Sequence, residues 1–316
     1  MTGLVVIGGP SASGKSALAL QLAEAANGVI VNADSMQLYR ELPLLSARPS
    51  AADEARVPHR LYGVLAADDP ASAGRWLQLA ADAIAATVAE GRLPIVVGGT
   101  GLYLKALLHG LAPVPELPAA ARRAAEARLE HLGAPGLHAL LAERDPAMAA
   151  RLRPSDRQRL VRASEVLSAT GRSLAAWQAE PVWRLALPAP VLGLALLPPR
   201  RELHERIAAR LRAMVEAGAL AELAAFRATG PRPDLPLLKA VGVAELLAHL
   251  EGRLELAEAL ARAIVRTRQY AKRQITWLRH QLPELRPLAT FGDDPALLRE
   301  DLALRAALVD RSRFDA

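Results

Sequence analysis

A glycine-rich stretch near the start of the chain has the residue types and spacing of a phosphate-binding loop. Residues 9–16 fit the pattern G-x-x-x-x-G-K-S. The glycines let backbone N–H groups curve around an anion, Lys15 carries a mobile charge, and the Ser16 hydroxyl is placed to bind Mg²⁺. The residues expected to bind a diphosphate or nucleotide are Gly9, Pro10, Ser11, Ala12, Ser13, Gly14, Lys15 and Ser16, with Ser16 also the metal ligand.

The segments on either side of this loop predict how it is held. Residues 4–7 are a continuous apolar run, which is typical of a strand buried on both faces. Residues 17–26 are rich in alanine and leucine without a breaker, so they predict a helix, whose N-terminus adds positive potential for an anion. A glycine-rich turn that matches by chance is the alternative, and the order of strand, loop and helix argues against it.

Two further strands are predicted to end near the loop. Residues 29–31 and 95–97 are short apolar runs, followed by Asp34 and by Thr100 respectively. The carboxyl ends of parallel strands face the ligand crevice, so both side chains are expected on the edge that holds the loop. From its position alone, Asp34 is explained equally well by a turn or helix N-cap. The second strand lacks the acid that supports Mg²⁺ in many phosphate-loop ATPases, which argues against plain nucleotide hydrolysis.

The composition is that of a globular chain with an anionic partner. Of 316 residues, 52% are hydrophobic and 23% charged, and the formal net charge is +6. The absence of cysteine excludes disulfides, thiolate catalysis and cysteine zinc sites. No apolar run reaches the roughly 18 residues of a membrane span, and no basic leader precedes the first strand. We therefore expect a cytoplasmic chain with no membrane partner, and a monomer.

An arginine-rich segment interrupts the alternation of strands and helices. Residues 113–190 begin and end with prolines and predict helices between them. Within residues 151–162, five arginines stand against the single acid Asp156. This bias favours binding to nucleic-acid phosphate, and an exposed face in a chain that prefers arginine to lysine is the alternative. We interpret the segment as a helical insertion in an α/β domain.

Two basic helices are predicted after the insertion. Residues 191–197 predict a fourth buried strand, and the helix over residues 202–217 carries Arg206 and Arg210 at i, i+4. These arginines suit a diphosphate clamp, although ordinary surface charge also explains them. The long helix over residues 255–281 has an apolar seam and a basic face with two aromatics, which suits an RNA backbone or is an ordinary solvated face. Residues after Asp310 are expected to fray.

Six stretches of the chain resemble the tRNA dimethylallyltransferases, also called tRNA isopentenyltransferases. Any one stretch has low or moderate specificity, but six in the right order over nearly the whole chain are very specific. They are Gly9-Pro10-Ser11-Ala12-Ser13-Gly14-Lys15-Ser16, Ala33-Asp34-Ser35-Met36-Gln37-Leu38-Tyr39-Arg40, Val57-Pro58-His59, Val97-Gly98-Gly99-Thr100-Gly101-Leu102-Tyr103, Asp156-Arg157-Gln158-Arg159-Leu160-Val161-Arg162-Ala163 and Arg268-Gln269-Tyr270-Ala271-Lys272-Arg273-Gln274-Ile275-Thr276-Trp277.

The resemblance implies an α/β fold with a phosphate-loop, kinase-like core, a parallel sheet covered by helices on both faces. Residues 1–112 and 191–316 would form this catalytic core, and residues 113–190 an all-helical insertion that binds the tRNA anticodon stem-loop. The implied reaction moves a dimethylallyl group from dimethylallyl diphosphate to the exocyclic amine of the adenine 3′-adjacent to the anticodon. The implied substrates are tRNAs that read codons starting with U; Mg²⁺ assists and diphosphate is released.

Roles for individual residues follow from the resemblance and from chain position together. Asp34 is expected to take the proton of the amine, Thr100 to contact the reacting centre, and Arg206 and Arg210 to help bind diphosphate. The residues expected to bind tRNA are Asp34, Ser35, Met36, Gln37, Thr100, Arg122, Gln158, Arg159, Leu160, Val161, Arg162, Lys272, Arg273, Gln274, Ile275, Thr276, Trp277, Leu278 and Arg279.

The chain departs from the family pattern at two places. Leu45-Ser46-Ala47-Arg48-Pro49 stands where the family usually has Gly-Thr-Ala-Lys-Pro, and the role of these residues is left open. Val241-Gly242-Val243-Ala244 stands where it usually has Val-Gly-Tyr-Arg, so an RNA contact by that tyrosine or arginine is not expected. Two other functions are open from the residues alone. A kinase on the same core would turn over ATP, and an RNA-binding protein with a nucleotide switch would bind tRNA without transfer.

Overall fold

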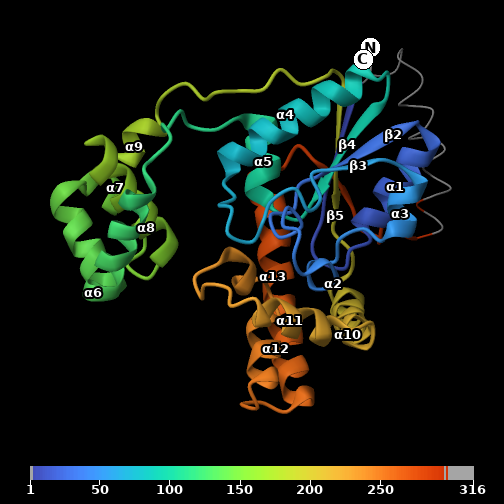
Figure 1. The fold of residues 1–316 in the computed structure, drawn as a ribbon. Coiled ribbons are helices and arrows are strands. Elements are labelled where there is room, and N and C mark those ends of the chain that lie inside the picture. The colour runs from blue at the N-terminus through green and yellow to red at the C-terminus, as the bar shows by residue number, and fades with distance from the viewer. Residues whose placement is uncertain (1–2, 295–296, 298–316) are drawn as a thin grey trace. The chain divides into compact units, whose positions relative to one another are not determined.

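The computed structural model of the chain describes residues 3–294 and 297 and divides into two compact units (Figure 1). The described parts of Met1–Leu108 and Ala186–Ala316 form the first unit, and His109–Leu185 forms the second. The predicted fraying after Asp310 lies outside the described residues.

Within the described residues, a six-stranded parallel sheet forms the centre of the first unit. The spatial order is β3-β2-β4-β1-β5-β6. The four strands predicted from apolar runs are confirmed, whereas the two edge strands have no apolar run to mark them. The strands are β1 (Leu4–Gly8), β2 (Gly28–Asn32), β3 (His59–Arg60), β4 (Leu93–Gly98), β5 (Val191–Leu196) and β6 (Arg286–Leu288).

Helices cover both faces of this sheet, which explains why its central strands are apolar without alternation. On one face, Val5 and Ile7 of β1 pack with Leu18 of the first helix. On the other, Leu104 and Leu278 close so tightly over Gly8 that a Cβ there would meet them at 3.1 and 2.8 Å. The helices are α1 (Lys15–Ala25), α2 (Pro43–Ser46), α3 (Ala51–Arg56), α4 (Ala73–Ala89), α5 (Gly101–His109), α10 (Arg200–Glu216), α11 (Ala219–Ala228), α12 (Val243–Leu250) and α13 (Leu256–Gln281), with a 3₁₀ turn at Pro236–Lys239.

The second unit is built from helices around a core of its own. Its helices are α6 (Ala119–Arg144), α7 (Pro146–Ala149), α8 (Arg157–Thr170) and α9 (Leu174–Trp177). Helix α6 bends at Gly133, where φ is +68°. The long helix and α8 supply most of the core, including Leu137, Leu141, Leu160 and Val166. Across residues 3–294, no helix combines the length and the apolar character needed to cross a membrane.

Candidate active site

The loop between β1 and α1 has the geometry that its sequence predicts. Ala12 and Gly14 adopt left-handed conformations, with φ of +64° and +82°. Left-handed residues within such a loop turn neighbouring N–H groups toward one concave side, where an anion binds. Helix α1 begins at Lys15, so its N-terminus also faces the loop. The loop is therefore an anion cradle formed mainly by backbone.

Two neighbouring segments hold this cradle in place. The N–H of Gly292 donates to the carbonyl oxygen of Ser13 at 2.9 Å. The side chain of Gln274, in α13, accepts from the N–H of Ser11 at 2.9 Å and donates to the carbonyl oxygen of Gly99 at 2.9 Å. The sequence predicts a tRNA contact for Gln274, but its amide is buried and joins the phosphate loop to the turn after β4.

Asp34 follows β2 and takes part in a turn while keeping one oxygen available. The N–H of Met36 donates to Asp34 Oδ1 at 3.0 Å, and the Asp34 N–H donates to Asn32 Oδ1 at 2.8 Å. Among the described residues, Asp34 Oδ2 has no hydrogen-bond donor. The turn role and the catalytic role left open by the sequence are therefore compatible, because they use different oxygens.

Thr100 fixes the backbone next to Asp34. Its Oγ1 accepts from the N–H of Ser35 at 2.9 Å and donates to Ser35 Oγ at 3.3 Å. Its own N–H donates to the carbonyl oxygen of Ala33 at 3.2 Å. The sequence predicts that Thr100 contacts the reacting centre. In the structure its hydroxyl is hydrogen-bonded to Ser35, and Thr100 is not among the described residues that line the pocket. The side chain thus holds the loop on which the carboxylate sits.

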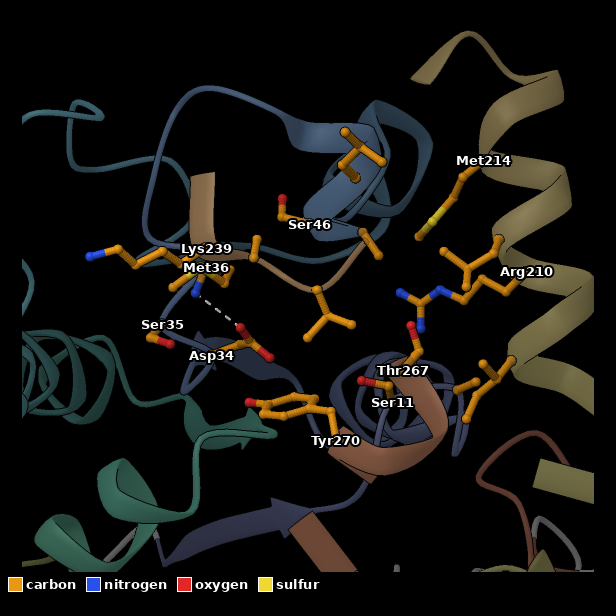
Figure 2. A pocket seen from close by; sticks show the side chains of 17 residues that line it. Ser11, Asp34, Ser35, Met36, Ser46, Arg210, Met214, Lys239, Thr267 and Tyr270 are labelled. Atoms are coloured by element: carbon orange, nitrogen blue, oxygen red, sulfur yellow. Dashed lines mark hydrogen bonds between the residues drawn. The ribbon is translucent and has the colours of Figure 1, made fainter. Parts of the chain in front are cut away.

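A pocket of about 220 Å³ lies between the phosphate loop and the Asp34 loop, with α2, α10, α13 and residues 239–241 completing its wall. Figure 2 shows Asp34 and Arg210 approaching this space from opposite sides, with Tyr270 below Asp34 and Thr267 beside Arg210. The remaining wall is largely apolar. Its apolar members are Ala12, Met36, Leu45, Ala47, Ile207, Leu211, Met214, Ala240 and Val241, and Lys239 also lines the pocket. One part of the pocket therefore carries the charged side chains of Asp34 and Arg210, and another part is apolar.

Two cations, Lys15 of the phosphate loop and Arg210 of the pocket wall, are held in a desolvated environment. Burial lowers the pKa of Lys15 to about 8, with the charge of Asp34 acting in the opposite direction. Burial also lowers the pKa of Arg210, again opposed by Asp34. The described residues offer Arg210 no ion pair or hydrogen bond of its own. Lys15 donates only a long hydrogen bond, 3.4 Å, to the carbonyl oxygen of Pro10. Both groups are thus prepared for an incoming anion.

Arg206 lies one helical turn from Arg210 but has different partners. Its guanidinium forms an ion pair with Asp293, at 2.6 Å, and lies 3.8 Å from the centre of the Phe291 ring. The structure therefore places Arg210, and not Arg206, in the pocket wall.

The residues of α13 that the sequence predicts to bind tRNA divide between surface and core. Lys272, Arg273, Thr276 and Arg279 are exposed. The three cations have no carboxylate partner among the described residues, and Arg273 lies over the ring of Tyr270. Trp277 is half-buried against Gly101, and Ile275 is half-buried in the core. Leu278 is buried, so its side chain presents no surface to RNA.

The residues predicted to bind tRNA in the loop after Asp34 also differ in where their side chains lie. Ser35 and Met36 line the pocket. The Gln37 side chain instead donates to the carbonyl oxygens of Ser46 and Ala47, at 2.9 and 2.7 Å. Its amide nitrogen is therefore engaged within the protein.

In the second unit, the predicted tRNA-binding residues lie on α6 and α8. Arg162 and Arg122 both face the buried carboxylate of Glu165, at 3.0 and 3.9 Å. Arg159 is far more exposed and only loosely paired, 3.5 Å from Asp156, and Gln158 is exposed too. Leu160 and Val161 belong to the core of the unit and are not available to RNA. Exposed cations thus alternate with core residues along α8.

The donor set at the loop fits Mg²⁺ as this ion usually binds with phosphates. Ser16 lies in the first turn of α1 and is exposed, and its hydroxyl makes no hydrogen bond to the described residues. Among those residues, no group of three His, Cys, Asp or Glu side chains forms a metal site. Mg²⁺ commonly takes one or two protein ligands and completes its shell with phosphate and water. Ser16 would be such a ligand.

Sequence reasoning missed several residues of the pocket wall. Thr267 and Tyr270 lie three apart on α13, and Ile207, Leu211 and Met214 surround Arg210 at helical spacing on α10. The spacing that marks one helix face was visible in the sequence. The sequence did not show which helix face turns toward the phosphate loop.

Comparison with known proteins gives a consistent result. The chain matches the family model described as IPP transferase over residues 37–281, and the model described as isopentenyl transferase over residues 2–68. It is 58% identical over 279 residues to a tRNA dimethylallyltransferase of Rhodospirillum rubrum, covering 88% of this chain and 86% of the relative. A tRNA dimethylallyltransferase of Rhodopseudomonas palustris is 54% identical over 280 residues, covering 89% of both chains.

Solved structures are also similar. The tRNA isopentenylpyrophosphate transferase of Bacillus halodurans has a TM-score of 0.70 and 29% identity, covering 100% of this chain and 99% of the other. A eukaryotic dimethylallyltransferase acting on tRNA has a TM-score of 0.79 and 25% identity, covering 98% of this chain and 80% of the other.

Proposed function

Because the chain belongs to the IPP transferase family, we propose that it transfers the dimethylallyl group of dimethylallyl diphosphate to the exocyclic amine of the adenine 3′-adjacent to the anticodon. It is a prenyltransferase that acts on tRNA. The proposed substrates are tRNAs that read codons starting with U, and diphosphate is released. A cytoplasmic location and a monomeric state remain predictions.

One observation carries the chemistry of this proposal. An anion cradle and a carboxylate with a free oxygen face a single pocket. A reaction that separates an anionic leaving group from a nucleophile that must lose a proton needs both, on opposite sides of the reacting carbon.

The cradle acts on the leaving group. The bond that breaks joins oxygen to an allylic carbon, and the diphosphate departs with the electron pair. Backbone N–H groups of the loop, Lys15 and Arg210 oppose the growing negative charge, and burial strengthens the effect of the two cations. Mg²⁺ held by Ser16 would supply further positive charge against the departing diphosphate.

Asp34 acts on the nucleophile. The amine of adenine is weakly nucleophilic because its lone pair is drawn into the ring. As nitrogen bonds to the allylic carbon, one amine proton passes to Asp34 Oδ2, while Oδ1 stays hydrogen-bonded to Met36. The adenine must leave its stack to reach the pocket. Thr100 keeps the carboxylate in place through Ser35.

Each unit supplies cations for the RNA backbone. In the first unit these are Lys272, Arg273 and Arg279, which are exposed without a carboxylate partner among the described residues. In the second unit, Arg159 on α8 is the most exposed of the arginines expected to bind tRNA. Contacts of this kind position a nucleic acid without reading its sequence.

One assay tests the proposal against a kinase and against an RNA-binding switch. The enzyme is incubated with Mg²⁺, an unmodified anticodon stem-loop, dimethylallyl diphosphate labelled in the prenyl group, and ATP labelled in the terminal phosphate. The prenyl label is expected to move to the RNA, at the adenine 3′ of the anticodon, while the ATP label stays in place. Movement of the phosphate label would favour a kinase. Binding of RNA with neither label moved would favour the switch.

A further inference from the structure

The short helix α2 forms part of the pocket wall, yet none of its four residues is buried. It contributes Leu45 and Ser46, and Ala47 follows directly. The helix has only 4 residues and no side-chain cap from its own N-cap residue. The residues at its two ends, Leu42 and Ala47, both adopt left-handed conformations, with φ of +55° and +56°. Such conformations are unfavourable for residues with a Cβ and persist only where the surroundings enforce them.

Side chains from elsewhere enforce the position of α2. Both oxygens of Glu222, on α11, accept hydrogen bonds from the first turn of α2: from the N–H of Leu44 at 2.9 Å and of Leu45 at 3.1 Å. At the other end of α2, the Gln37 amide holds the carbonyl oxygens of Ser46 and Ala47. The Glu222 carboxylate also lies at the positive end of the helix, where its charge is favourable.

The hydrogen bonds of Glu222 connect the two apolar walls of the pocket. One wall is α2, with Leu45. The other wall is α10, with Leu211 and Met214, and α10 continues through Gly218 into α11, which carries Glu222. Glu222 itself does not line the pocket.

We propose that Glu222 is a positioning residue that sets the width of the prenyl pocket by fastening α2 to the helix pair α10–α11. The inference rests on the proposed function, since it concerns where the dimethylallyl group is held. A carboxylate with two backbone N–H groups is a strong, two-point link, and losing it leaves those N–H groups to water. With the link broken, α2 moves outward, the apolar wall loosens around the prenyl group, and water reaches the allylic carbon.

Water in the pocket would divert the reaction. The water oxygen bonds to the allylic carbon as the carbon–oxygen bond to diphosphate breaks. Diphosphate leaves with the electron pair, and a proton of the attacking water goes to solvent. The products are dimethylallyl alcohol and diphosphate, so diphosphate is released without prenylation of tRNA. The ratio of alcohol to prenylated RNA therefore measures how well the pocket is closed.

Glu222→Ala and Glu222→Gln, both in the full-length chain, test the role. The glutamine keeps one acceptor and turns a donor toward the second N–H, so its effect is expected to be intermediate. Glu216→Ala is the matched control, because Glu216 is an exposed glutamate at the end of α10 with no hydrogen bond or ion pair to α2 among the described residues. Titration calorimetry with dimethylallyl diphosphate needs no RNA, and product analysis with tRNA gives the ratio of alcohol to prenylated RNA.

Glu222→Ala is expected to raise the Kd for dimethylallyl diphosphate about tenfold, the equivalent of one charge-assisted hydrogen bond, and to raise the alcohol fraction. Glu216→Ala should have the wild-type Kd and the wild-type alcohol fraction. If Glu222→Ala lowers the unfolding temperature while Kd and product ratio stay unchanged, Glu222 is merely structural and the inference fails. If Glu222→Ala does not fold, wild-type values in Glu222→Gln overturn it instead. Failure of the wild type to prenylate tRNA would defeat the proposed function, while the Kd comparison would still judge Glu222.

Discussion

The hydroxyl of Thr100 accepts the backbone N–H of Ser35, with 2.9 Å between Oγ1 and N, and so joins the end of β4 to the loop after β2. Thr100→Val removes this bond while keeping the shape of the side chain. We expect kcat to fall about fivefold, because a net hydrogen bond of about 1 kcal/mol no longer holds the Asp34 loop. Thr100→Ser keeps the oxygen and should retain most of the rate. Steady-state kinetics with tRNA and dimethylallyl diphosphate check both, and a Thr100→Val enzyme with the wild-type kcat would contradict the role.

Asp34 can be tested with two variants that separate its two oxygens. Asp34→Asn keeps an acceptor for the N–H of Met36 but cannot take a proton, whereas Asp34→Ala loses both functions. Both should lower kcat by about 10²- to 10⁴-fold, the usual range for a positioned base. Binding of tRNA, measured by filter retention, should change little. A near-normal kcat in Asp34→Asn would show that Asp34 serves only the turn.

The pKa of Lys15 predicts how substrate binding depends on pH. Burial lowers this pKa to about 8, so the ammonium is charged below pH 8 and loses its charge as the pH rises above it. The KM for dimethylallyl diphosphate should therefore be constant below pH 8 and increase above it. Lys15→Ala should have a high KM at every pH, without this inflection. Lys105→Ala, which alters a half-buried lysine that donates to Gln281, is the control and should keep the wild-type profile. The same inflection in Lys15→Ala would assign the titration to another group.

Gln274 is expected to act on the phosphate loop and not on tRNA. Gln274→Leu leaves the N–H of Ser11 and the carbonyl of Gly99 without their partner, at a cost of about 1–3 kcal/mol for each group left buried. The KM for dimethylallyl diphosphate should increase and the unfolding temperature should fall, while the Kd for tRNA stays constant. Gln269→Leu, on an exposed part of the same helix, controls for the change of residue type. Weaker tRNA binding with an unchanged KM would restore the role expected from the sequence.

The arginines of α8 can be tested through the salt dependence of tRNA binding. Arg159 is 65% exposed and only 3.5 Å from Asp156, and the neighbouring Arg157 is also exposed. Arg157→Gln with Arg159→Gln should weaken binding and reduce the slope of log Kd against log salt by about 1 for each phosphate that the variant no longer neutralises. Arg162 is not a suitable target, because its removal would leave the buried Glu165 with only a distant partner. Arg232→Gln, in the other unit, is the control. An identical slope in the double variant would argue against phosphate binding by these arginines.

Several parts of this protein could be predicted from short stretches of its sequence. The phosphate loop, the four buried strands, the long helices and the helical insertion each have a local cause: glycine spacing, apolar runs, helical periodicity or proline boundaries. The edge strand β6 (Arg286–Leu288) was not predicted, because its three residues are partly exposed and show no such pattern. The short helix α2 (Pro43–Ser46) was not predicted, because the Glu222 carboxylate that binds its first turn lies 178 residues away from Leu44 in the sequence.

Contacts between distant segments determine which of the candidate residues face the pocket. Arg206 and Arg210 lie one turn apart on the same helix. Arg206 forms an ion pair with Asp293 and packs on the Phe291 ring, whereas Arg210 lines the pocket. Gln274 and Arg273 are neighbours, yet one is buried between two loops and the other is exposed. A helix presents its residues in all directions, and its own sequence marks the apolar face. Which polar residue meets a ligand depends on the partners brought by distant segments, and those exist only in the folded chain.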